Sequence, residues 1–226
     1  MPKNLTDDTF VRELPVTIRH AVLASYKAAS DLLGKAAFFA VLVVAARSLS
    51  TDAFGVFSLA STLGWILSVG TDFGLQLYMA REIARARGSI GTILPPILRL
   101  RLWLTAAAAL ATVAAATLYL PVREALPFIA IACAYLVSAL VEFLNYAYRA
   151  VERSELESTL NLSQRLITLV LALVLLRVSP GLGSLAFALL VPPVAMLVIS
   201  LRVVSRLAEG TTQRRLNLLY FREAPS

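Results

Sequence analysis

The chain has 226 residues and a mass of 24.4 kDa; 58% of its residues are hydrophobic and only 15% are charged. Because soluble domains carry about 45–50% apolar and about 25% charged residues, this composition argues against a water-soluble domain and against a disordered chain. The net charge of +7 comes from Lys and Arg residues that flank apolar segments, where such residues fix membrane orientation, so we expect no nucleic-acid partner.

The segment before the first apolar run, residues 1–30, has its large apolar side chains four positions apart: Phe10, Leu14, Ile18, Val22 and Tyr26. This spacing predicts an amphipathic helix that lies on the cytoplasmic surface of the lipid bilayer.

Residues 31–207 contain apolar runs of about the 20 residues that a helix needs to cross a hydrocarbon layer. The runs are continuous, whereas strands of a membrane barrel alternate over about ten residues. The sequence therefore predicts an all-α polytopic membrane protein, with six transmembrane helices at about 31–49, 54–79, 97–120, 126–146, 160–176 and 185–204.

The basic residues are distributed very unequally between the two sides of these predicted spans. Sixteen of the 21 Lys and Arg residues fall on the side of the two termini, and only Arg47, Arg123 and Arg177 fall on the other side. By the positive-inside rule, both termini are expected in the cytoplasm.

Residues 208–226 predict a basic amphipathic cytoplasmic tail or linker. An interfacial segment of this kind normally leads into another helix, so the chain looks cut off just before a seventh span.

Four of the predicted spans carry polar side chains at helical spacing, and ionisable groups within a membrane are functional candidates by default. The stripes consist of Lys27, Asp31 and Lys35; Ser58, Ser61, Trp65, Ser68, Asp72 and Gln76; Tyr135, Ser138, Glu142, Asn145 and Arg149; and Asn161, Arg165 and Thr168. They predict a water-filled cavity open to the cytoplasm, while the third and sixth spans, which are almost purely apolar, are expected to face lipid.

A structural role is the alternative for each of these residues. Asp72 or Glu142 would then pair with Arg165, and Asp31 with Lys35 one turn away. Gly70 and Gly74 form a small-xxx-small pair of the kind that allows close helix packing.

The presence of only one cysteine and one histidine argues against enzyme chemistry. Cys133 is the one cysteine and His20 the one histidine, which excludes a cysteine-based metal site, a multi-histidine site and a Ser-His-Asp arrangement. We expect no enzyme, no metal site and no cofactor.

Two segments resemble a known family. Residues 46–60, ARSLSTDAFGVFSLA, are similar to the junction between the first two helices of bacterial lipid-linked oligosaccharide flippases, the O-antigen and polysaccharide exporters of the multidrug/oligosaccharidyl-lipid/polysaccharide exporter superfamily. Residues 72–75, DFGL, and 81–85, REIAR, resemble the end of the second helix in that family.

The resemblance implies one six-helix lobe of a two-lobe transporter in the bacterial inner membrane, which turns a lipid-linked glycan over. A second lobe, or a second copy of this chain in a homo-oligomer, would then be needed to complete the working unit. Lys35 and Arg165 would then bind the diphosphate within the membrane, and Arg81, Arg85 and Arg149 would attract it at the cytoplasmic mouth. The remaining cavity candidates would solvate the sugar or order the cations: Asp72, Gln76, Glu142, Asn145 and Asn161.

Three other functions stay open at this point. The chain is alternatively a small-molecule exporter of the same superfamily, a non-transporting membrane scaffold of a polysaccharide-assembly complex, or an inactive truncated remnant.

Overall fold

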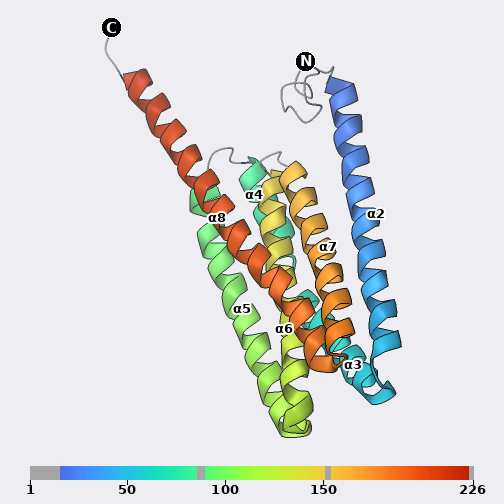
Figure 1. Cartoon of the computed structure of the whole chain (residues 1–226). Coiled ribbons are helices and arrows are strands. Elements are labelled where there is room, and N and C mark those ends of the chain that lie inside the picture. The colour runs from blue at the N-terminus through green and yellow to red at the C-terminus, as the bar shows by residue number, and fades with distance from the viewer. Residues whose placement is uncertain (1–15, 86–89, 151–153, 224–226) are drawn as a thin grey trace.

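The computed structural model describes the backbone of residues 16–85, 90–150 and 154–223, and the side chains of residues 25–85, 90–150 and 156–206. The described residues form long helices and no strand (Figure 1). The helices are α2 (Val16–Ser48), α3 (Thr51–Gly70), α4 (Leu75–Arg85), α5 (Ile90–Tyr119), α6 (Val122–Ala150), α7 (Ser154–Val178) and α8 (Leu182–Glu223).

Six of these helices are long and apolar enough to cross a membrane, which confirms the predicted all-α polytopic fold. Short connections join them, as at the start of α3, where the Ser50 hydroxyl accepts a hydrogen bond of 3.3 Å from the backbone N–H of Ala53. The candidate spans are Ser25–Ser48, Thr51–Gly70, Ile90–Tyr119, Val122–Ala150, Leu156–Val178 and Leu182–Arg206.

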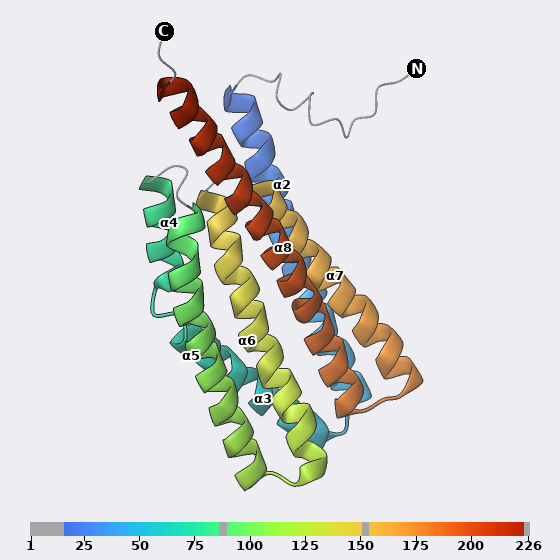
Figure 2. The same cartoon turned by 90° about the vertical axis from the view of Figure 1, so that its left-hand side faces the viewer.

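The second span differs from its prediction. We expected one helix over residues 54–79, but α3 ends at Gly70 and α4 begins at Leu75, with a turn between them (Figure 2). The backbone turns because Phe73 and Gly74 both have positive φ angles, of 44° and 75°. A left-handed conformation cannot continue a right-handed helix.

The two predicted terminal segments are continuous with spanning helices where the structure describes them. Residues 16–30 belong to α2, and residues 208–223 belong to α8. The first part of the predicted surface helix, with Phe10 and Leu14, lies outside the described residues.

Helix α6 lies at the centre of the bundle and packs against α3, α4, α5 and α8, while α2 packs along α7 (Figure 2). Helix α8 packs along both α6 and α7. One face of the sixth span is buried against these neighbours through small residues such as Ala186 and Ala188, whereas Phe187, Val194 and Val198 on its other face are exposed.

Two apolar clusters hold the bundle together, one toward each end. The outer cluster lies near the α2–α3, α5–α6 and α7–α8 connections and takes residues from every spanning helix; examples are Ala45, Phe57, Ala116, Phe128, Leu176 and Leu185. The inner cluster joins α4, α5, α6 and α8 and contains Met79, Ile83, Ile90, Phe143, Tyr148 and Val204. The buried residues of the inner cluster include none from α2 or α7, although Leu160 of α7 packs against it as a partly buried residue.

Candidate functional site

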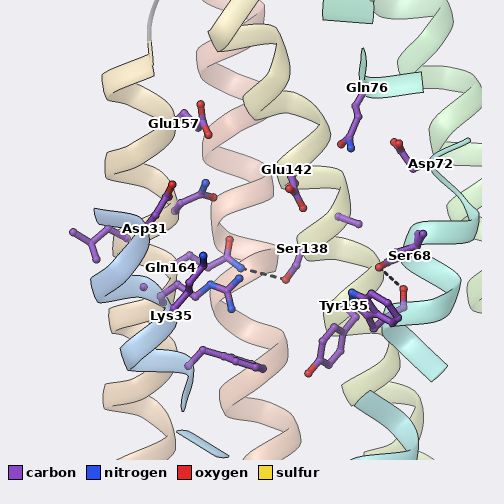
Figure 3. Close-up of a pocket in the computed structure, with 18 of the residues that line it drawn as sticks. Asp31, Lys35, Ser68, Asp72, Gln76, Tyr135, Ser138, Glu142, Glu157 and Gln164 are labelled. Atoms are coloured by element: carbon purple, nitrogen blue, oxygen red, sulfur yellow. Dashed lines mark hydrogen bonds between the residues drawn. The ribbon is translucent and has the colours of Figure 1, made fainter. Parts of the chain in front are cut away.

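A cavity of about 960 Å³ lies between the helices, and side chains from α2 to α7 line it (Figure 3). Helices α2 and α7 form one wall, and α3, α4, α5 and α6 form the other. The four predicted polar stripes supply most of the polar lining. Of the candidates from the sequence, the cavity is lined by Lys35, Asp72, Gln76, Glu142, Arg149, Asn161 and Arg165.

The α2–α7 wall carries two cations. Lys35 and Arg165 are both exposed toward the cavity, and the Arg165 guanidinium lies 5.1 Å from the centre of the Phe38 ring. Gly34 allows this approach, since a Cβ there would lie 3.4 Å from Arg165 Cγ. Among the described residues, no ion pair joins Lys35 or Arg165 to a carboxylate, so both charges remain available to an anion.

The opposite wall carries Asp72, Gln76 and Glu142, as Figure 3 shows. Asp72 forms an ion pair with Arg101, with 3.7 Å between Oδ1 and Nη1. The pairing of Asp72 or Glu142 with Arg165 and the pairing of Asp31 with Lys35, both weighed from the sequence, are absent from the described ion pairs.

Sequence reasoning missed Arg101, which lies inside α5 with 1% of its side chain exposed. It falls near the start of the predicted third span, where we counted it among the basic residues on the side of the termini, and we expected that span to face lipid. The structure begins α5 at Ile90, so Arg101 lies three turns into the helix and reaches the cavity wall.

Hydrogen bonds between α6 and α7 follow the edge of the cavity. Gln164 Nε2 donates to Ser138 Oγ at 3.2 Å, and Asn145 Nδ2 donates to Asn161 Oδ1 at 2.9 Å. Asn145 is fully buried and does not line the cavity, so this predicted site residue fastens the two helices to each other.

Glu157 is the second residue that sequence reasoning missed. It has 2% of its side chain exposed, and its carboxylate pairs with Lys27 of α2 and with Arg149 of α6. Arg149 is therefore held by a carboxylate within the protein, which makes it less available to a phosphate than Lys35 or Arg165. The guanidinium of Arg149 also lies 4.4 Å from the centre of the Tyr146 ring.

The other two mouth candidates, Arg81 and Arg85, are exposed on α4 and do not line the cavity. Arg85 pairs with Glu82 one turn earlier, at 3.2 Å. The described residues contain no group of three or more His, Cys, Asp or Glu that would hold a metal ion.

Comparison with known proteins gives one match. A family described as "Polysaccharide biosynthesis protein" matches residues 24–223, which include all the residues that line the cavity. No curated protein and no solved structure matches the chain.

Proposed function

The chain belongs to the polysaccharide biosynthesis protein family, and from that premise we propose that it moves a lipid-linked oligosaccharide or polysaccharide precursor across the bacterial inner membrane. The observation that carries this proposal is the cavity within an apolar bundle, with two unpaired cations on one wall and hydrogen-bonding groups on the other.

The chemistry of such a substrate accounts for these features. A polyprenyl tail can remain in the lipid, whereas a diphosphate and a glycan need a polar path through the hydrocarbon layer. The guanidinium of Arg165 can donate two parallel hydrogen bonds to phosphate oxygens, and Lys35 adds a second positive charge on the same wall. Gln76, Glu142 and Asn161 offer groups that hydrogen-bond sugar hydroxyls.

We further propose that both termini lie in the cytoplasm, because the basic residues gather on that side of the spans. The cavity then opens toward the cytoplasm, where lipid-linked precursors are assembled. The outer apolar cluster closes the other end of the bundle.

A second six-helix lobe, or a second copy of this chain, would complete the transport path. Helix α2 packs on α7 and α3 packs on α6, but no extensive contact joins α2 to α3. This side of the cavity is therefore not closed by helix packing within the described residues, and a partner lobe would cover it.

The test is an Arg165→Ala substitution in the full-length protein, expressed in source cells that lack the native gene. We expect wild-type protein to deliver the lipid-linked glycan to the outer leaflet and the variant to lose at least about tenfold of that delivery, because a charge-assisted contact contributes about 1.5–3 kcal/mol. The measurement is binding of a membrane-impermeant lectin to the glycan on spheroplasts, at matched protein levels.

The matched control is Arg177→Ala, which removes an exposed arginine from the same helix but outside the cavity, and which should transport normally. If gene deletion blocks glycan assembly while Arg165→Ala delivers glycan normally, the cavity role is wrong and a scaffold function is favoured.

A further inference from the structure

Residues 71–74, called the elbow below, join α3 to α4 beside the cavity and break the hydrogen-bond pattern of a continuous helix. The backbone N–H of Asp72 donates to the carbonyl of Val69 at 3.1 Å, one residue short of the regular α-helical acceptor, Ser68. The Ser68 carbonyl therefore loses its normal backbone donor and accepts instead from the Thr71 hydroxyl, at 3.0 Å.

The backbone of the elbow is also strained at Phe73, although the strained conformation does not bury the Phe73 side chain. Phe73 has a φ of 44°, a conformation that costs free energy for a bulky side chain, and it is 82% exposed. Glycine would adopt this conformation with less strain, as Gly74 does beside it with a φ of 75°. Strain that packing does not explain is a signal of a functional backbone conformation.

Arg101 of α5 contacts both the Ser68 carbonyl and the Asp72 carboxylate. Its Nη2 donates to the Ser68 carbonyl at 3.4 Å, and its Nη1 lies 3.7 Å from Asp72 Oδ1. Asp72 in turn accepts a hydrogen bond from the N–H of Gly74 at 3.2 Å through its other oxygen, Oδ2. Through its contacts with Ser68 and Asp72, Arg101 thus links α5 to the elbow on both sides of the break.

These contacts are incomplete, although Arg101 is almost fully buried. Its Nε and Nη1 have no hydrogen-bond partner, and neither has Asp72 Oδ1. A buried guanidinium with unfilled donors raises the free energy of the bent arrangement.

We propose that the elbow is a two-state switch, bent when Arg101 holds Asp72 and the Ser68 carbonyl, and straight when α3 and α4 form one continuous helix. In the straight state, the Asp72 N–H bonds the Ser68 carbonyl and Phe73 loses its strain, while Arg101 loses the contacts of the bent state. The bent state keeps the Arg101 contacts but strains Phe73, whereas the straight state relieves Phe73 but loses the Arg101 contacts. A bistable element requires opposed gains and losses of this kind.

The switch repositions one wall of the cavity. Helix α4 carries Gln76, which lines the cavity, and it packs through Met79 and Ile83 into the inner apolar cluster. Straightening the elbow therefore moves Gln76 and changes the packing of Met79 and Ile83 at the same time. A role for this movement in the transport cycle rests on the proposed function, whereas the existence of two states does not.

The test measures the position of α4 directly, with the full chain in lipid nanodiscs. In a Cys133→Ala background, spin labels at Tyr78→Cys on α4 and Leu118→Cys on α5 report the distance across the elbow, since both positions are exposed. A reference pair, Leu59→Cys on α3 with Leu118→Cys, should not change, because neither label lies beyond the elbow.

The proposed switch predicts that substitutions which destabilise the bent state and substitutions which stabilise it shift the distance between the labels in opposite directions. Gly74→Ala and Arg101→Met should move the distance distribution toward the straight state, and Phe73→Gly should move it toward the bent state, each by roughly tenfold in population ratio. Gly70→Ala is the matched control. A Cβ meets nothing within 4 Å at either glycine, but Gly70 lacks the positive φ, so this variant should behave as wild type.

One shared distance distribution for wild type, Gly74→Ala and Phe73→Gly would overturn the proposal, and these two variants do not disturb a buried charge. If the distances shift as expected while wild-type protein delivers no glycan, the switch is supported and the proposed function is wrong. If glycan is delivered and no variant shifts the distance, the switch is wrong and the proposed function stands.

Discussion

The carboxylate of Glu157 is buried, and among the described residues its ion-pair partners come from other helices. Lys27 of α2 and Arg149 of α6 both reach it, so three helices meet at one buried group beside the cavity. Loss of that carboxylate leaves two cations close together without a counter-charge, although both remain partly exposed to solvent.

We expect Glu157→Gln to lower the free energy of unfolding by about 2 kcal/mol. Breaking a buried pair costs about 3–5 kcal/mol, and the partial exposure of the two cations reduces this cost. Thermal unfolding in detergent micelles measures the effect.

The control for Glu157→Gln is Glu82→Gln, which removes a pair with Arg85 on the surface of α4 and should change stability by less than about 0.5 kcal/mol. Equal stability losses in the two variants would show that burial of Glu157 contributes nothing.

The sequence predicted candidate residues best where a polar group interrupts an apolar run. Lys35 and Arg165 stand out for that reason, and both line the cavity. Arg101 and Glu157 lie near span ends, where charges are ordinary, so nothing in the sequence separates them from loop residues. Their burial depends on which helices meet there, and local sequence does not contain that information.

At the scale of elements, the contact between α3 and α6 depends on one glycine. A Cβ at Gly64 would lie 2.9 Å from Ala132 Cα and 3.1 Å from Tyr135 Cβ, so the two helix backbones approach as closely as a glycine permits. The small-xxx-small pair expected to pack closely, Gly70 and Gly74, faces open space instead.

We expect Gly64→Ala to destabilise the bundle by about 1–3 kcal/mol, because the added methyl group overlaps backbone that cannot move alone. The measurement is the midpoint of thermal unfolding in micelles. Gly55→Ala, in the same helix but with open space around it, should be neutral or slightly stabilising. Equal midpoints for wild type and Gly64→Ala would contradict the close approach.

Hydropathy predicted the existence of the spanning helices but not the break in the second one. Residues 71–74 contain a polar pair, Thr71 and Asp72, that fits the face of a continuous helix as well as it fits a turn. The backbone of Phe73 decides between them, and a bulky aromatic residue gives no sequence signal for a left-handed conformation.

At the scale of the whole molecule, the structure separates two ends of different character. The α2–α3, α5–α6 and α7–α8 connections lie at one end, and the start of α2 and the end of α8 lie at the other (Figure 1). Six spans and their polar stripes could be predicted from the sequence. Which helices pack against each other could not be predicted from the sequence. Lipid is as apolar as the packed helix surfaces, so hydropathy does not tell a lipid-facing surface from a packed one.

The proposed orientation predicts which positions a membrane-impermeant maleimide reaches in spheroplasts that carry Cys133→Ala. Arg123→Cys, at the start of α6, should label at once, whereas Arg85→Cys, at the end of α4, should label only after the membrane is permeabilised. Both side chains are exposed, so accessibility of the side chain itself does not differ. The reverse labelling pattern would place the termini outside the cytoplasm.

The volume of the cavity has a consequence for the membrane around the protein. A space of about 960 Å³ holds on the order of thirty water molecules at liquid density. Water at that depth shortens the distance over which the protein insulates one compartment from the other, so the electrical barrier is concentrated across the outer apolar cluster. In the proposed orientation, Phe57 and Phe128 of that cluster would therefore do more than hold helices together: they would form part of the layer that keeps small ions from crossing through the cavity.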